Sequence, residues 1–248
     1  MNTILAFIAH PDDESYSFAG TLALAARQGW RCLVHCVTHG ERGERHDGQP
    51  ALPSRLADTR EEELTASCQA LRIEPPRFWG LPDGQLHAHR GEQHHIQQLI
   101  QREAPDLLLS LGPDGAYGHP DHLALHRWVT EAWAALGDPP PLLYVAFPPG
   151  LFLPQYEKCR QSGIMGDPPL VAPGDIGAPA HHYQVDITRR QRAKLRAIES
   201  HVSQLPGGDP RALFPPGIVD SLLETERFHD AAGVYQEDVD RLLAELTG

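Results

Sequence analysis

The feature that most constrains this chain is an apolar run at its start that ends abruptly in polar and acidic residues. Ile4 to Ala9 has the composition of a buried strand, and His10-Pro11-Asp12-Asp13-Glu14 follows directly. A second run, Leu107 to Ser110, precedes a similar cluster, Tyr117-Gly118-His119-Pro120-Asp121-His122. In an open α/β sheet, ligands bind in the crevice at the carboxyl ends of the strands. We therefore expect both clusters to open at the same edge of one sheet.

Strand and helix patterns alternate along most of the chain. Helices are expected at about residues 15–28, 55–71, 92–103, 121–136, 188–203 and 236–246. Strands are expected at about residues 4–9, 31–38, 77–79, 106–110, 142–147 and 183–187. Strands that are separated by helices form parallel sheets through crossover connections. The sequence predicts a single Rossmann-like α/β domain over residues 1–248, with a mostly parallel sheet flanked by helices and the active site at the carboxyl ends of the strands.

Two Pro- and Gly-rich segments show no stable periodicity. Residues 148–181 are expected to form a long loop or lid, and residues from about 205 to 228 are expected to be irregular. A charged, Gly-containing loop is expected between residue 38 and Pro53. Long loops inside a domain commonly carry function. We therefore interpret the 148–181 segment as a functional loop rather than as a linker.

The charge balance excludes several classes of partner. The 248 residues include 21 Lys and Arg and 33 Asp and Glu, a formal net charge of −12, without a basic run that could follow a phosphate backbone. Nucleic acid and anionic membranes are therefore unfavourable partners. No apolar run approaches the roughly 18 residues that span a bilayer, and the start lacks the pattern of a signal peptide. We expect a cytoplasmic protein that acts on a small soluble molecule; a homo-oligomer is compatible with the sequence.

The two His/Asp clusters contain the ligand types of a hydrolytic metal site. A catalytic zinc commonly has three protein ligands and an open position for water. His10, Asp13 and His122 can supply that set. Pro11 forces a turn after His10, and Pro120 suits the first position of a helix that would carry His122. Cys is absent from both clusters, and the four cysteines, expected to be reduced and mostly buried, are too scattered for a CxxC site. We expect Zn²⁺, with Fe²⁺ or another divalent ion as the alternative.

The same clusters offer groups for proton transfer. Asp12 lies next to a candidate ligand and is the natural general base, with Glu14 as the first alternative. Asp12 could instead only cap the following turn. His119, protonated and held by Asp121, is the candidate donor to the oxyanion of a tetrahedral intermediate, and Tyr117 is a second, mobile candidate. These roles together describe the hydrolysis of an amide by an activated water molecule.

These motifs resemble the zinc-dependent N-acetylglucosamine deacetylases of the LmbE-like or PIG-L family. That family includes deacetylases of the mycothiol, bacillithiol and glycosylphosphatidylinositol pathways. The resemblance covers roughly residues 3–205 and extends to Thr38 to Glu44, Arg60 with Glu63-Leu64, Leu81 to Gly84, and Lys194, Ala197, His201, Ser203 and Gln204. It implies metal ligation by the positions that match His10, Asp13 and His122. No catalytic position departs from the family pattern.

The resemblance also implies a substrate class. It suggests a hydrolase that removes the acetyl group from an N-acetylglucosamine-containing glycoside, with Arg60 and Asp83 as substrate-binding residues. Taken alone, Arg60 and Glu63 could form an exposed helical ion pair, and Asp83-Gly84 is a turn signal. The leading expectation is bacillithiol-type N-acetylglucosaminyl malate, whereas inositol or another aglycone stays open.

Three other functions fit parts of the sequence. An amidase that cleaves a glucosaminyl thiol S-conjugate would use the same site. A non-catalytic sugar-binding protein could share the fold, although the presence of Asp12 and His119 argues against it. A nucleotide-binding Rossmann protein is unfavourable, because the first strand–helix turn lacks G-x-G-x-x-G and its negative charge repels a pyrophosphate.

Overall fold

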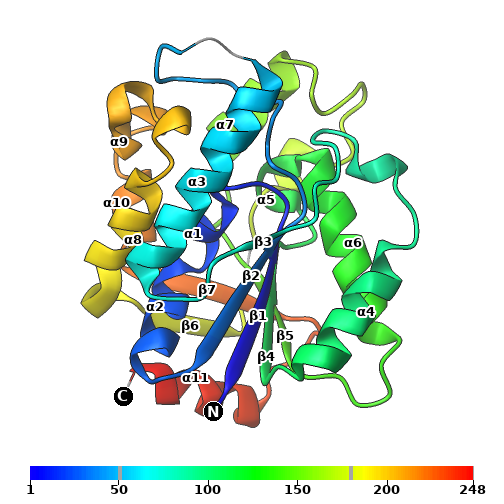
Figure 1. The fold of residues 1–248 in the computed structure, drawn as a ribbon. Coiled ribbons are helices and arrows are strands. Elements are labelled where there is room, and N and C mark those ends of the chain that lie inside the picture. Colours follow the sequence, from blue (N-terminus) through cyan, green and yellow to red (C-terminus); the bar gives the residue numbers. More distant parts are fainter. Residues whose placement is uncertain (50–51, 179–180, 248) are drawn as a thin grey trace.

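The computed structural model describes residues 1–49, 52–178 and 181–247. Its centre is a seven-stranded sheet with the order β3-β2-β1-β4-β5-β7-β6 (Figure 1). The strands are β1 (Thr3–Ile8), β2 (Arg31–Cys36), β3 (Arg77–Phe78), β4 (Leu107–Ser110), β5 (Leu142–Val145), β6 (Tyr183–Asp186) and β7 (Thr225–Asp230). β1 to β5 are parallel, whereas β7 is antiparallel to both β5 and β6. The prediction of an α/β domain with a mostly parallel sheet is confirmed.

The strand order brings the two polar clusters to one point. β1 and β4 are parallel neighbours, with Leu5 opposite Leu108. From β1 the chain continues to β2 and β3 on one side, whereas from β4 it continues to β5 on the other. The carboxyl ends of β1 and β4 therefore form the switch point at which open α/β sheets bind ligands. Both clusters begin there, as expected.

Helices cover both faces of the sheet. One layer contains α2 (Ala19–Arg27), α3 (Pro53–Leu71), α8 (Gln191–Glu199) and α11 (Glu237–Thr247), and the other contains α4 (Glu92–Glu103) and α6 (Pro120–Ala134) (Figure 1). Along β1, Ile4 and Ile8 join the core beneath the first layer, whereas Leu5 and Phe7 join the core beneath the second. A strand that is buried on both faces requires the continuous apolar run seen in the sequence.

The described residues also form α1 (Asp13–Ser17), α5 (Gly115–Gly118), α7 (Leu153–Gln161), α9 (Pro210–Leu213) and α10 (Ile218–Leu222). The helix expected over 15–28 is divided into α1 and α2, because Phe18 leaves the helical conformation with a φ of −150°. The segment 148–181, expected to be a loop, contains α7. Its residues 179–180 lie outside the described residues, as do residues 50–51 of the loop expected before Pro53.

The expectation of irregular structure from about 205 to 228 is wrong. This segment contains α9, α10 and the first part of β7. The buried positions of β7 are Glu226, Phe228 and Asp230. Glu226 accepts hydrogen bonds from the Thr21 backbone at 2.7 Å and from the Lys194 ammonium at 2.6 Å. Because charged side chains with partners of their own occupy buried positions, the usual apolar alternation of a strand is missing from the sequence.

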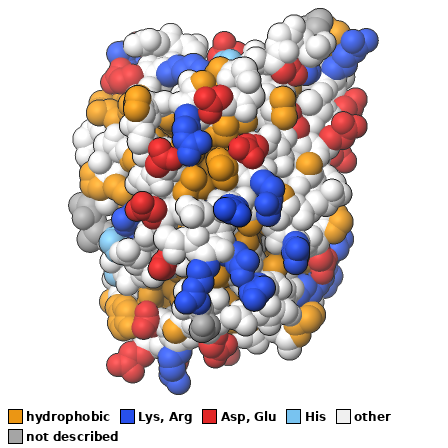
Figure 2. Space-filling model, turned by 90° about the vertical axis from the view of Figure 1, so that its left-hand side faces the viewer, with side chains coloured by type: hydrophobic (Ala, Val, Ile, Leu, Met, Phe, Trp, Pro, Cys, Tyr) orange, Lys and Arg blue, Asp and Glu red, His pale blue; other side chains and the backbone are white. Residues whose placement is uncertain are grey.

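Basic side chains that are separated in the sequence gather on one face. Burial and the nearby Arg27, Arg72 and Arg189 lower the pKa of Arg190. Figure 2 shows Lys and Arg side chains grouped in the lower half of the face seen from the left of Figure 1. Arg27 ends α2 and Arg72 caps α3, so this group lies toward the amino ends of the strands, away from the switch point. Within the described parts of the chain, every helix is too short or too polar to cross a bilayer.

Candidate active site

The candidate catalytic side chains lie at the carboxyl ends of two strands and at the start of one helix. His10 follows β1, Asp12 occupies the turn, and Asp13 begins α1. His119 is the N-cap of α6, and His122 lies in its first turn, as the sequence predicts. The α6 N-terminus meets the end of β1 because β4, which leads into this region, is the neighbour of β1.

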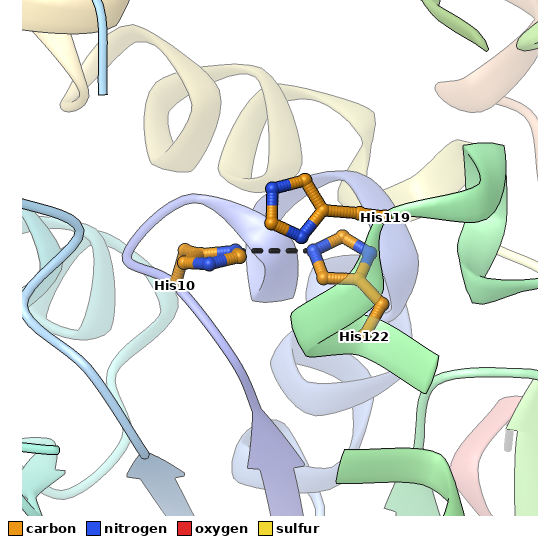
Figure 3. A group of neighbouring side chains, drawn as sticks. All are labelled: His10, His119 and His122. Carbon is orange, nitrogen blue, oxygen red and sulfur yellow. Dashed lines mark hydrogen bonds between the residues drawn. The ribbon is translucent and has the colours of Figure 1, made fainter. Parts of the chain in front are cut away.

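The side chains of His10, Asp13 and His122 converge. His10 Nδ1 lies 3.1 Å from His122 Nε2, as the dashed line in Figure 3 shows. Asp13 Oδ1 lies 3.1 Å from His122 Nε2, and Asp13 Oδ2 lies 3.8 Å from His10 Nδ1. All three residues are buried. Ligand atoms around a tetrahedral ion with bonds of about 2.0–2.2 Å are separated by about 3.5 Å. The three residues therefore have the spacing of ligands around one ion.

Hydrogen bonds fix the direction of both imidazoles. His122 Nδ1 lies 3.0 Å from the Gly115 carbonyl oxygen, to which it can donate. His10 Nε2 lies 3.1 Å from Asp83 Oδ1 and 3.3 Å from Asp121 Oδ2. When each ring is neutral and its proton lies on the nitrogen that contacts these oxygens, His10 Nδ1 and His122 Nε2 both direct a lone pair toward the same point. Imidazoles that are oriented by carboxylate and carbonyl groups are typical metal ligands, so the donor set fits a divalent cation.

The charges around this set also favour a cation. Burial opposes a charge on His10, yet Asp83 and Asp121 raise the pKa of His10 well above its ordinary value. Burial likewise opposes ionisation of Asp13, but His122 and His10 lower the pKa of Asp13 below its ordinary value. Carboxylates therefore stay ionised around the imidazoles, which is the arrangement that a bound divalent ion requires.

Two other groupings of potential ligands overlap this set: His10 with His119 and His122, and His10 with Asp83 and Asp121. His119 Nδ1 accepts a hydrogen bond from the Asp121 backbone N–H at 3.2 Å, so its neutral ring carries the proton on Nε2 and is a donor. The Asp83 and Asp121 carboxylates accept hydrogen bonds from the backbone N–H groups of Arg42, Gly84 and Leu86. Both carboxylates contact His10 Nε2, whereas it is His10 Nδ1 that faces His122. Asp13 Oδ1 lies beside His122 Nε2, so we place Asp13 as the third ligand candidate.

The expectation that Asp121 holds a protonated His119 is wrong. The Asp121 carboxylate faces His10 and the backbone amides of residues 84 and 86, whereas only its backbone N–H contacts the His119 ring. Burial and the neighbouring His10 and His122 lower the pKa of His119 well below its ordinary value, although Asp121 acts in the opposite direction. A neutral His119 can still donate a hydrogen bond through Nε2.

Asp12 occupies a strained turn beside the three candidate ligands. Its φ of 119° lies in the left-handed region, which costs a non-glycine residue about 1–3 kcal/mol and is common at functional sites. Asp12 Oδ2 lies 3.1 Å from Arg60 Nη2, and the Asp12 backbone N–H donates to Glu14 Oε2 at 3.1 Å. Burial, against the effect of Arg60, raises the pKa of Asp12 to about 6. A carboxylate with this pKa can exchange a proton near neutral pH.

The alternative that Asp12 only caps α1 is wrong, because its side chain makes no capping hydrogen bond within the described residues. Glu14, the alternative base, is fully buried and already accepts hydrogen bonds from Ser67 Oγ at 2.6 Å and His201 Nε2 at 2.9 Å. Glu14 therefore stabilises the Asp12 turn by accepting a hydrogen bond from the Asp12 backbone N–H. Sequence reasoning missed this network, since residues 14, 67 and 201 are far apart in the chain.

Arg60 is directed toward the candidate base. Besides Asp12, it donates to the carbonyl oxygens of Gly40 and Pro11. Glu63 is also buried and accepts hydrogen bonds from Ser203, so the alternative of an exposed Arg60–Glu63 ion pair is wrong. Because these donors are used within the protein, orientation of the Asp12 carboxylate is the main visible role of Arg60.

Asp83 does more than form a turn, because its carboxylate contacts His10 Nε2 at 3.1 Å. Both Asp83 and Arg60 also line the larger of two cavities at the site. A substrate contact by either residue therefore stays a prediction, beside the contacts that they make within the protein.

Two cavities meet beside Asp12. The polar cleft, with a volume of about 520 Å³, is lined by His10, His119, Arg42, Lys158 and further polar residues, and also by apolar side chains such as Ile164. The apolar cavity, with a volume of about 80 Å³, is bounded by Asp13 and His122 on one side. Asp12, Tyr117, Gln155 and Leu213 line both. A substrate bond that lies next to Asp12 would therefore have the polar cleft on one side and the apolar cavity on the other.

Comparison with known proteins identifies both a family and close sequence relatives. The family model PIG-L, GlcNAc-PI de-N-acetylase, matches residues 5–133 and so includes both polar clusters. The 1D-myo-inositol 2-acetamido-2-deoxy-alpha-D-glucopyranoside deacetylase of Nakamurella multipartita is 30% identical over 242 residues, 82% of this chain and 81% of that protein. The deacetylase of the same name from Actinosynnema mirum is 29% identical over 262 residues, 91% of this chain and 90% of that protein.

Solved structures share the fold. The N,N'-diacetylchitobiose deacetylase from Pyrococcus horikoshii superposes with a TM-score of 0.66 and 21% identity, covering 92% of this chain and 83% of that one. The 4-carboxy-2-hydroxymuconate hydratase from Pseudomonas putida superposes with a TM-score of 0.65 and 20% identity, covering 93% and 96%. Because a deacetylase and a hydratase share this fold, the reaction has to be argued from the site.

Proposed function

This chain belongs to the PIG-L family, and from that membership we propose that it is a metal-dependent N-deacetylase of a small N-acetylglucosaminyl glycoside. The observation that carries the proposal is the convergence of His10 Nδ1, His122 Nε2 and Asp13 Oδ1 beside the Asp12 carboxylate. The names of the relatives, which are acetamido-glucopyranoside deacetylases, support removal of an acetyl group.

We assign the metal to His10, Asp13 and His122, with Zn²⁺ as the proposed ion because two imidazoles and a carboxylate are a common ligand set of hydrolytic zinc. A divalent cation held there would lower the pKa of a water molecule and polarise the amide carbonyl. Asp83 and Asp121 support the ion through His10, whose Nε2 they contact.

The residues around the ion carry the proton transfers. Asp12, oriented by Arg60, accepts a proton from the water molecule that attacks the amide carbon. His119 donates a hydrogen bond through Nε2 to the carbonyl oxygen as negative charge develops on it. Asp12 then transfers its proton to the leaving nitrogen as the C–N bond breaks. One water molecule is consumed, and acetate and the free amine are produced.

The polar cleft is the proposed site of the sugar and its aglycone. Arg60 and Asp83 are our proposed sugar contacts. Arg42 and Lys158 also line the cleft, and their positive charges suit the carboxylates of malate, the aglycone of the bacillithiol-type substrate. The names of the relatives include myo-inositol instead. The two glycosides therefore have to be compared directly.

The test is to incubate the metal-loaded protein with N-acetylglucosaminyl malate, with N-acetylglucosaminyl inositol and with a glucosaminyl thiol S-conjugate, and to measure the binding of each compound and the release of acetate and primary amine. We expect equal amounts of both products from at least one glycoside, and their loss in an Asp12→Asn variant that retains its metal. Binding of both glycosides without acetate would indicate a sugar-binding protein. Cleavage restricted to a glucosaminyl thiol S-conjugate would indicate an amidase. Either result would overturn the proposal.

A further inference from the structure

The apolar cavity has a wall of aromatic side chains from separate parts of the chain. The aromatic residues that line it are Tyr16, Tyr117, Phe147, Phe152 and Phe214. Phe214 contacts Tyr16 edge-on with ring centroids 5.3 Å apart, and Phe152 at 5.5 Å. Phe152 in turn contacts Phe147 edge-on at 4.5 Å. These rings form a continuous apolar wall, to which the segment between β5 and α7 contributes Phe147 and Phe152 and the segment after α9 contributes Phe214.

The position of this cavity relative to the catalytic groups indicates which part of the substrate it binds. Asp13 and His122 line the apolar cavity, whereas His10 and His119 line the polar cleft, and Asp12 lines both. An amide whose carbon lies next to Asp12 has its sugar nitrogen on one side and its acyl chain on the other. The sugar hydroxyls need the polar cleft, because burying them in an apolar cavity would leave them without partners. The acyl chain therefore enters the apolar cavity.

The cavity is larger than an acetyl group requires. Its volume is about 80 Å³, whereas roughly 10–15 Å³ is enough for a cavity to hold one water molecule. An acetyl group would place a single methyl group there and leave most of the aromatic wall without contact. Contacts with an apolar wall become favourable when an acyl chain is extended, since each buried methylene strengthens binding about fourfold.

We propose that this protein removes short-chain acyl groups from glucosamine nitrogen, with N-butyryl preferred over N-acetyl, and that the aromatic wall sets this preference. The inference rests on the proposed N-deacetylase function, whose site it shares. A butyryl chain adds two methylenes to the acetyl group and keeps within the cavity. An octanoyl chain exceeds the cavity and has to displace the wall.

The first experiment measures kcat/KM of the metal-loaded protein for one glucosaminyl glycoside carrying N-acetyl, N-propionyl, N-butyryl or N-octanoyl groups. We expect kcat/KM to rise roughly fifteenfold from acetyl to butyryl, because two methylenes are added, and to fall at octanoyl. A steady decrease from acetyl to butyryl would overturn this inference and leave the proposed function standing. Failure to hydrolyse any member of the series, acetyl included, would overturn the proposed function and this inference with it.

The second experiment changes the wall. Phe214 is half-buried, so Phe214→Trp narrows the cavity and Phe214→Ala widens it. We expect the butyryl-to-acetyl ratio of kcat/KM to fall at least fivefold in Phe214→Trp, and the optimum chain to lengthen in Phe214→Ala. Because both substrates are measured on one preparation, the ratio does not depend on how much protein is folded.

The matched control is Phe78→Ala. Phe78 is also a half-buried aromatic residue, but it stacks on His39 with ring centroids 4.7 Å apart and lines neither cavity. This variant should keep the wild-type ratio. Equal ratios in wild type, Phe214→Trp and Phe214→Ala would show that the wall does not select the acyl chain.

Discussion

The candidate metal ligands and the wall of the apolar cavity are neighbours that are held in place by different forces. Each candidate ligand has a directional partner: His10 the Asp83 carboxylate, His122 the Gly115 carbonyl, and Asp13 the backbone N–H of His10 at 2.9 Å. The wall consists of aromatic rings in edge contact. Apolar groups of similar volume can replace one another for less than about 1.5 kcal/mol, whereas a displaced ligand loses its ion. Substitutions of the ligands should therefore abolish turnover, and substitutions of the wall should change selectivity.

The largest expected effect is that of His122→Ala. With three protein ligands, loss of one should reduce the metal content below one tenth of an equivalent and remove measurable deacetylase activity. The measurement is metal per chain together with acetate release. His126→Ala is the matched control, because His126 lies one turn further along α6 and hydrogen-bonds the Leu111 carbonyl instead. A full equivalent of metal in His122→Ala would contradict the ligand assignment.

Asp12→Asn should retain the metal and lower kcat by about 10² to 10⁴, because an amide cannot accept a proton from water. Metal content and kcat are measured on the same sample. Asp58→Asn, an exposed position on α3, provides the control for the change of charge. Normal turnover in the metal-loaded Asp12→Asn variant would mean that a different group is the base.

His119→Ala should lower kcat by about 10² to 10³, the usual effect of losing one donor to an oxyanion. KM and metal content should change little, since this hydrogen bond strengthens mainly in the transition state. His87→Ala, at an exposed position, is the control. A large loss of metal in His119→Ala would instead support the grouping in which His119 is itself a ligand.

Asp83→Asn should weaken metal binding by about 10- to 100-fold, because groups that orient a ligand imidazole typically have effects of this size. Competition with a chelator of known affinity measures the change. When the metal is saturating, the Asp83→Asn variant should recover most of the wild-type deacetylase activity. Loss of substrate affinity with unchanged metal affinity would support the contact with sugar hydroxyls that the sequence suggests for Asp83.

The convergence of His10, Asp13 and His122 could be predicted from the sequence for a physical reason, whereas their role as ligands stays a prediction. A strand that is buried on both faces is necessarily a continuous apolar run, and its end is visible where His10 begins. Parallel neighbours then bring the ends of β1 and β4 together without any further information. The roles within the cluster were less accessible: the contact of the Asp121 carboxylate with His10, rather than with His119, depends on where the loop at residues 84–86 places its backbone N–H groups.

The wall of the apolar cavity could not be predicted in the same way. Tyr16, Phe152 and Phe214 are isolated aromatic residues, two of them in segments that the sequence describes only as Pro- and Gly-rich. Phe152 follows the carboxyl end of β5, and Phe214 precedes the amino end of β7. These two ends lie together because β5 and β7 are antiparallel neighbours, with Val145 opposite Phe228. The buried positions of β7 include Glu226 and Asp230, so the apolar pattern of a strand is absent. Pairing between polar groups that are far apart in the chain cannot be recognised from the local sequence pattern.

Tyr117 belongs to both regions, and its substitution should have the smallest effect. Its ring contacts His122 edge-on with centroids 5.2 Å apart, and it also contacts Phe152, so Tyr117→Phe preserves its place in the wall. Burial raises the pKa of Tyr117 well above its ordinary value, so its hydroxyl stays protonated and can donate to the oxyanion.

Because His119 supplies the other donor, we expect Tyr117→Phe to lower kcat by only about three- to tenfold, less than one oxyanion donor usually contributes. Tyr117→Leu should lower it further and also change the butyryl-to-acetyl ratio, since the ring itself is lost from the wall. The measurement is kcat and this ratio for both variants at full metal loading. A loss above 100-fold in Tyr117→Phe would make the hydroxyl a principal donor and place Tyr117 with the catalytic residues, whereas unchanged kcat would place it with the wall alone.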